Sequence, residues 1–167
     1  MKKSIILAAL LAASSSAMAV DSENLYAGGG LGFNSIDVSG ADSAMGFQFF
    51  GGYTFDLEAA PTLNFAAEAG YMTSGDFDVE FVNPFTGTKT TVSGGSADGI
   101  WMSGVASYPM NDQLSLIGRI GLDFGDDDGV LFGFGAGYSL GKSLGVRGEY
   151  VLRDSIDSLQ LNATFKF

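Results

Sequence analysis

Polar and apolar residues alternate along most of the chain after its first twenty residues. In the closing segment "SLQLNATFKF" the alternation continues without a break from Ser158 to Phe167. Successive side chains of a strand point to opposite faces, so a period of two is typical of β-strands with one apolar face. The pattern predicts eight strands, at residues 25–33, 45–55, 63–71, 100–108, 114–124, 130–140, 144–152 and 159–167.

The two faces of these predicted strands differ in chemistry. Counted from the first residue of each strand, alternate positions carry no charge, amide or Ser/Thr hydroxyl; residues 114–124, for example, place Leu114, Leu116 and Ile120 there. A soluble barrel that holds a ligand has an apolar interior, whereas a membrane barrel has an apolar exterior and a polar interior. The opposite face holds Asn64, Glu68, Ser103, Ser115, Arg119, Asp123, Ser139, Arg147, Glu149, Gln160, Asn162, Thr164 and Lys166.

This distribution predicts an all-β fold: an eight-stranded antiparallel up-and-down transmembrane β-barrel formed by residues 20–167. The strand lengths suit a membrane, since a tilted spanning strand needs about 9–11 residues. An even number of strands lets the sheet close, and closure is required because lipid cannot satisfy the backbone groups of an open edge.

The connections between the predicted strands alternate in length. "DLEAAPT", "PMNDQ" and "GKS" are short and are expected at the periplasmic end, whereas the longer connections are expected outside the cell. The longest of these, residues 72–99, contains "FDVEFVNPFTGTKTTV", which predicts a hairpin that turns near residues 83–87 and stands above the membrane.

The first residues have the pattern of an export signal. Lys2 and Lys3 precede the apolar run "SIILAALLAA", and "SSSAMA" ends in the small-x-small pattern of a signal peptidase site. We expect residues 1–19 to be a cleaved signal peptide, with the cut after Ala19. The mature barrel is then expected in the outer membrane, in contact with outer-membrane lipid and lipopolysaccharide.

The composition narrows the chemistry further. The chain has no Cys and no His, which excludes disulfides and zinc sites built on thiolate or imidazole. Its net charge of −11 makes nucleic acid an unsuitable partner, because phosphate contacts need a basic face. Nothing in the sequence indicates a cofactor or a catalytic residue. The "GDDDG" segment is an acidic loop tip rather than a cation site in our interpretation.

Aromatic residues mark the ends of the predicted strands. Phe165 and Phe167 close the chain, and Tyr108, Tyr138 and Phe55 fall near the same level, as expected of rings that prefer a membrane interface. The closing pattern also resembles the C-terminal signal that outer-membrane proteins present to their assembly machinery. We therefore expect Phe165 and Phe167 to act as an assembly signal.

The ordered segments "LYAGGGLGF", "FFGGYTF", "FAAEAGY", "SYPMNDQLSLIGRIG" and "VRGEY" together resemble the OmpA-type eight-stranded outer-membrane barrel family. The resemblance covers the barrel alone, without a periplasmic domain. It implies that Glu68 in "FAAEAGY" and Arg147 in "VRGEY" point inward and form a pair, with Arg119 and Glu149 beside them. The family's second buried pair has no counterpart, because Val105 and Gly137 stand near the positions it would need.

These four charges suggest a lumen network with several possible roles. Buried charges persist only when they are paired, so a structural polar plug is the preferred interpretation. A gate that exchanges partners and a catalytic carboxylate pair of Glu68 and Glu149 are the alternatives. Known catalytic barrels rely on His, and this chain has none, so the catalytic pair is disfavoured. For the whole protein, a monomeric structural or surface-interaction barrel is expected, and a narrow gated, porin-like channel is the alternative.

Overall fold

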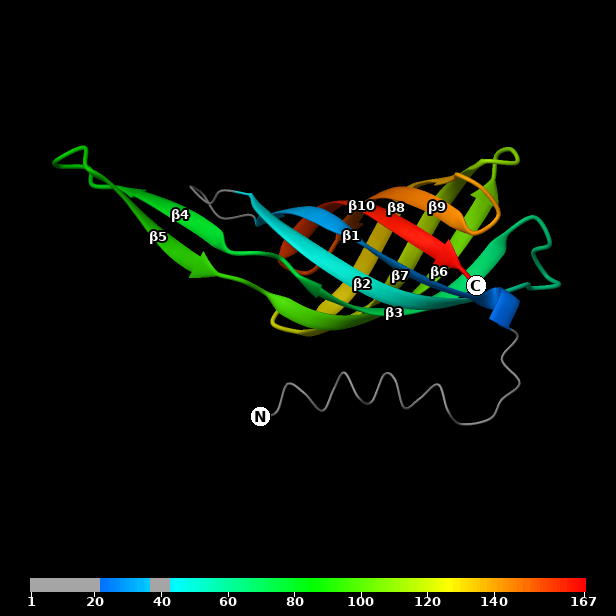
Figure 1. Ribbon diagram of the computed structural model, residues 1–167. Helices are drawn as coiled ribbons and strands as arrows, with labels where there is room; N and C mark the ends of the chain where they lie inside the picture. The colour runs from blue at the N-terminus through cyan, green and yellow to red at the C-terminus, as the bar shows by residue number, and fades with distance from the viewer. Residues whose placement is uncertain (1–21, 37–42) are drawn as a thin grey trace.

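The computed structural model describes residues 22–36 and 43–167, so the predicted signal peptide at residues 1–19 lies outside the described residues. Eight strands form one closed barrel, in the order β1-β10-β9-β8-β7-β6-β3-β2 (Figure 1). The predicted fold class is confirmed. The barrel strands are β1 (Leu25–Ile36), β2 (Ala44–Phe55), β3 (Asn64–Thr73), β6 (Asp98–Pro109), β7 (Leu114–Gly125), β8 (Gly129–Ser139), β9 (Leu144–Leu152) and β10 (Ile156–Lys166).

Every neighbouring pair of barrel strands is antiparallel, including the first and last. Strand β1 pairs with β10 from Tyr26 opposite Lys166 to Ile36 opposite Ile156, which closes the sheet. Because closure leaves no edge, the backbone groups at membrane depth all have partners. A short 3₁₀ helix, η2 (Ser22–Asn24), precedes β1. Within the described ranges, no helix is long and apolar enough to cross a membrane.

The burial of the strands follows the predicted alternation. In β2, Phe47 and Phe49 are about half exposed on the outer wall, at 52% and 45%, while Gln48 between them is 5% exposed. Large apolar side chains cover the outside of the other strands in the same way, among them Leu116, Ile120 and Phe134. Such an apolar exterior is stable only against lipid, so the barrel wall is the membrane-spanning part of the molecule.

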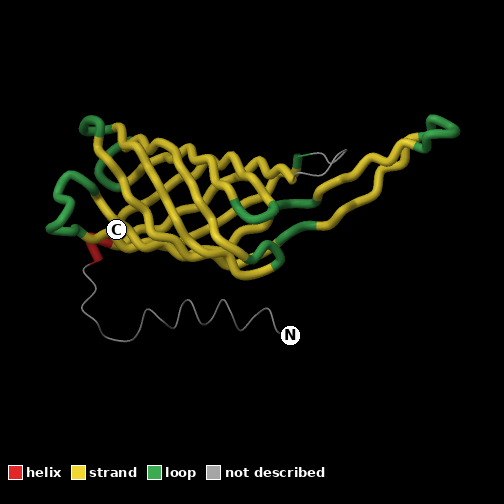
Figure 2. Tube along the Cα trace, turned by 180° about the vertical axis from the view of Figure 1, so that it is seen from behind, coloured by secondary structure: helices red, strands yellow, loops and turns green. Residues whose placement is uncertain are grey.

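Strands β4 (Phe77–Val82) and β5 (Lys89–Gly95) form a separate two-stranded sheet. This hairpin projects well beyond the barrel, at the end opposite the C-terminus (Figures 1 and 2). At its tip the side chain of Asn83 accepts a hydrogen bond from the Phe85 amide at 2.9 Å, and Gly87 has the positive φ of 67° that the turn requires. The hairpin predicted to turn near residues 83–87 is therefore present.

Several barrel strands extend further toward the hairpin end than predicted. Strand β3 continues to Thr73 and not to residue 71, and β6 begins at Asp98 and not at residue 100. The last strand likewise begins at Ile156 and not at residue 159. The apolar outer face that marks a strand in the sequence exists only where lipid surrounds the wall. Beyond that level the backbone pairing continues without an apolar outer face, so the sequence pattern underestimates the length of these strands. At the other end, the last strand stops at Lys166 and not at Phe167.

Candidate functional site

The interior of the barrel brings together the four predicted charged residues: Glu68 on β3, Arg119 on β7, and Arg147 and Glu149 on β9. Arg119 Nη2 lies 3.1 Å from Glu68 Oε2 and 2.7 Å from Glu149 Oε2. Arg147 Nη1 lies 2.7 Å from Glu68 Oε1, and its Nε lies 3.4 Å from Glu149 Oε1. Each arginine thus contacts both carboxylates, so the cluster has a net charge of zero, and all four side chains are almost completely buried.

The strand register explains why such long side chains fit in a narrow barrel. Arg119 is directly opposite Gly133 on β8, and Glu149 is opposite Gly135. A Cβ at Gly133 would meet the Arg119 side chain, and a Cβ at Gly135 would meet Glu149. Glycines on the inner face of β8 therefore provide the space that the charged cluster occupies.

Tyr26 on β1 adds a neutral partner that the sequence analysis missed. Its hydroxyl donates a hydrogen bond to Glu68 Oε1 at 2.5 Å, and the same oxygen accepts one from Arg147 Nη1. The Tyr26 ring also lies under the Arg147 guanidinium, with 5.9 Å between the guanidinium carbon and the ring centre. The hydroxyl connects the wall formed by β1 to the ion pairs on β3 and β9.

An apolar layer adjoins the charged cluster, and the sequence analysis missed it as well. Phe50 and Trp101 point inward, and their rings pack against each other with centroids 5.7 Å apart. The Arg147 guanidinium lies 4.8 Å from the Phe50 ring centre, and Arg119 lies 5.3 Å from that of Trp101. One signal was available: "FFGG" contains two consecutive phenylalanines, of which one must face inward. The buried members of the layer are Phe50, Met72, Trp101, Leu131 and Val151.

Polar side chains fill the lumen between this layer and the hairpin end. Gln48 donates to the side chains of Gln160 and Asn162, at 2.8 Å in both cases. Arg153 forms a 3.0 Å salt bridge with Asp123 and donates a hydrogen bond to Ser158. Arg153 was not predicted because it follows the end of β9 and belongs to no alternating segment. These contacts close the lumen on the side of the long loops.

The acidic loop between β7 and β8 bonds to neighbouring backbone. Asp126 Oδ2 accepts from the Asp98 amide at 3.0 Å, and Asp127 Oδ1 accepts from the Ser155 amide at 3.0 Å. Among the residues that the structure describes, no three His, Cys, Asp or Glu side chains are grouped as a metal site. These carboxylates link the loop to β6 and to the loop after β9.

On the hairpin, Lys89 Nζ lies 2.8 Å from Glu80 Oε1 across the two strands. The hydrogen bond from Lys89 to the Glu80 carboxylate raises the pKa of Lys89. Both side chains are largely exposed, so the pair contributes little to stability.

Phe165 and Phe167, the predicted assembly signal, lie together at the other end of the barrel. Their rings are 5.6 Å apart in an edge-to-face arrangement, and the Phe167 amide donates to the Leu25 carbonyl at 3.1 Å. Both rings are exposed on the outer wall, at 51% and 65%. Their role in assembly stays a prediction.

A closed eight-stranded barrel with an apolar outer wall and a polar, filled lumen defines a transmembrane β-barrel of the outer membrane. Residues 5–167 match the family described as "Outer membrane protein beta-barrel domain". The chain belongs to this family, and the protein is an outer-membrane protein.

Solved structures share the fold at low sequence identity. A designed transmembrane β-barrel is 17% identical with a TM-score of 0.58, and the match covers 87% of this chain and 96% of the designed one. The attachment invasion locus protein Ail of Yersinia pestis is 13% identical with a TM-score of 0.51, over 86% of this chain and 96% of Ail. Both likenesses concern the fold alone. No curated protein sequence matches the chain.

Proposed function

We propose that the protein is a non-conducting outer-membrane barrel that acts through its extracellular loops, in a structural or surface-interaction role. The observation that carries this proposal is the closed interior: four mutually paired charges and an apolar layer fill the lumen at one level. An eight-stranded barrel has an interior just wide enough for side chains. With the lumen filled at this level, passage through the barrel is blocked, and the exposed loops are the surface that faces the outside of the cell.

The β4–β5 hairpin is the strongest candidate for that surface. Phe85 at its tip is 95% exposed, and Phe81 on β4 is 59% exposed. Because the hairpin stands outside the barrel, its apolar side chains are not accounted for by the lipid that covers the wall. Exposed apolar and aromatic side chains on a projecting element are typical of contact surfaces.

A narrow gated channel is the alternative function. A cavity of about 270 Å³ reaches Arg147 from the end with the short turns, so a rearrangement of the charged cluster is what conduction would require. Such a rearrangement separates several ion pairs at once, because each arginine contacts both carboxylates. The cost of leaving buried charges unpaired favours the closed barrel.

Our proposal includes no catalytic activity, because the chain lacks the His on which catalytic barrels rely. It does include contact with outer-membrane lipid and lipopolysaccharide along the apolar wall, and a monomeric state. It also includes recognition of Phe165 and Phe167 by the assembly machinery. For the last point, deletion of Phe167 is expected to slow the appearance of protease-protected barrel while leaving the free energy of unfolding nearly unchanged. Equal assembly rates for parent and deletion would remove the signal role.

The surface role is tested with liposomes that carry the protein. Their binding is measured against an array of purified surface proteins and polysaccharides, with the variant F81S/F85S beside the parent. The control is M110S, which removes an exposed apolar side chain from the turn between β6 and β7 at the opposite end. We expect at least one ligand whose binding is lost in F81S/F85S and kept in M110S. Equal binding of the parent and both variants to every protein and polysaccharide in the array would contradict the role of the hairpin.

A further inference from the structure

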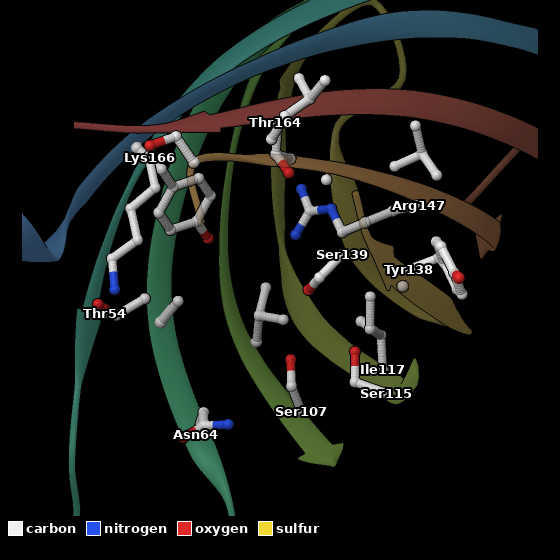
Figure 3. Close-up of a pocket in the computed structure, with 18 of the residues that line it drawn as sticks. Thr54, Asn64, Ser107, Ser115, Ile117, Tyr138, Ser139, Arg147, Thr164 and Lys166 are labelled. Carbon is white, nitrogen blue, oxygen red and sulfur yellow. The ribbon is translucent and has the colours of Figure 1, made fainter. Parts of the chain in front are cut away.

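The cavity below the charged cluster has a lining rich in hydrogen-bonding groups. It has a volume of about 270 Å³ and lies inside the barrel at the end where the strands join by short turns (Figure 3). That end faces the periplasm in barrels of this architecture. Tyr26, Ala66, Val105 and Ile117 pack together at its inner end. The Ser, Thr and Asn side chains that line it are Thr54, Asn64, Ser107, Ser115, Ser139, Ser143 and Thr164.

The charged residues that line this cavity are all basic. Lys142, Lys166 and Arg147 belong to the lining, and none of the described lining residues is Asp or Glu. This is unexpected in a chain with 19 acidic and 8 basic residues, two of the basic ones being Lys2 and Lys3 in the predicted signal peptide. Half of the six remaining basic residues therefore gather around one cavity.

The two lysines differ from the other cations in their partners. Lys89 is paired with Glu80, Arg153 with Asp123, and Arg119 with two carboxylates. Within the described ranges, Lys142 and Lys166 have no salt-bridge partner. The salt bridges there are Lys89–Glu80, Arg119–Glu68, Arg119–Glu149, Arg147–Glu68, Arg147–Glu149 and Arg153–Asp123.

Arg147 contributes a second, independent feature. It is only 9% exposed, and its Nη2 has no hydrogen-bond partner among the described residues, although Nη1 and Nε contact the two carboxylates. Figure 3 shows its guanidinium among the lining hydroxyls. A buried guanidinium N–H without an acceptor is costly, and a ligand oxygen would satisfy it.

The backbone holds the two lysines near each other. The Lys166 amide donates to the Ser143 carbonyl at 2.8 Å, which fixes the end of β10 against the turn that carries Lys142. Both lysine side chains are exposed at the rim, whereas Arg147 lies further in. An anion that enters from the periplasm thus meets the lysines first and the guanidinium last.

We propose that this cavity binds a small soluble phosphate ester from the periplasm. The phosphate oxygens accept a hydrogen bond from Arg147 Nη2, the rim residues Lys142 and Lys166 attract the anion by their positive charge, and the surrounding hydroxyls bond to the polar part of the ester. The cavity opens into the lumen of the barrel, and the lipid around the outer wall does not enter the lumen. The ligand therefore comes from solution. This site is at the opposite end from the hairpin and does not depend on the proposed surface role.

The test uses the refolded protein in a non-ionic maltoside detergent and glycerol 3-phosphate as the probe, followed by ³¹P NMR. The variant K142Q/K166Q removes both rim charges at exposed positions, and its folding is checked by gel migration before and after boiling. The control K89Q removes an exposed lysine from the hairpin. We expect saturable binding to the parent, at least tenfold weaker binding to K142Q/K166Q, and a change within twofold for K89Q. Added salt should weaken binding to the parent, because the contacts are ionic.

Two results of this titration would overturn the proposal. One is the absence of saturable binding to the parent, and the other is equal affinity of the parent and K142Q/K166Q. A parallel titration with dihexanoyl phosphatidylglycerol separates a soluble ester from a lipid headgroup. Tighter binding of glycerol 3-phosphate supports the assignment, whereas tighter binding of the lipid contradicts it.

Discussion

Two levels of the same barrel contain cations in opposite situations. At mid-barrel, Arg119 contacts Glu68 and Glu149, and every charge has an opposite charge within reach. At the periplasmic end, Lys142 and Lys166 line a cavity without a carboxylate. The difference teaches that the place of a cation in the barrel does not determine its role. The presence or absence of an opposite charge from the same chain does. Paired charges contribute to structure, and unpaired ones at a cavity are available to a ligand.

The largest effect should come from removing one member of the mid-barrel cluster. Glu68→Ala leaves Arg119 and Arg147 short of an acceptor in a buried site, which typically lowers the free energy of unfolding by about 3–5 kcal/mol. Arg147→Ala should have an effect of the same size. Urea unfolding of the refolded barrels measures both. Because the two side chains contact each other, the double variant should lose less than the sum of the single losses; additive losses would show that they do not interact.

A smaller effect is expected from the neutral partner of the cluster. Tyr26→Phe removes the hydroxyl that donates to Glu68 and keeps the ring beneath Arg147. Hydrogen bonds to charged groups contribute about 1.5–3 kcal/mol, so the free energy of unfolding should fall within that range. The matched control is Tyr108→Phe on the outer wall, which should change the unfolding midpoint very little. An equal shift in both variants would argue against a specific role for the Tyr26 hydroxyl.

The smallest effect should come from the lining of the periplasmic cavity. Ser115→Ala and Ser107→Ala remove hydroxyls for which the cavity offers room, and no packed neighbour is lost. The free energy of unfolding should change by less than about 0.5 kcal/mol. Losses comparable to that of Tyr26→Phe would show that the hydroxyls stabilise the fold, and the contrast between the two levels of the lumen would weaken.

The alternation predicted the barrel and assigned the four charges to the inner face of its strands, for a physical reason. Lipid outside and a narrow polar lumen inside impose one rule on every strand, so Glu68 and Arg119 stand out as charges on the inner face. The resemblance to the OmpA-type family then implied which of them pair. The rule does not predict the apolar layer around Phe50 and Trp101, because their places in the alternation indicate an inward direction but not that their rings pack beside the charges. It also fails for Arg153, which lies beyond the end of β9, and for the cavity lysines, which lie near each other because the end of β10 bonds to the turn that carries Lys142.

The measurement that tests the closed lumen most directly is the conductance of the parent protein in a planar lipid bilayer. The filled level around Glu68, Arg147 and Trp101 predicts almost no open events at moderate voltage, and more frequent openings in the double variant E68A/R147A. The variant Y108F, changed only on the outer wall, should behave as the parent does. A large and steady conductance in the parent would contradict the account, because it would show that the lumen is a working pore.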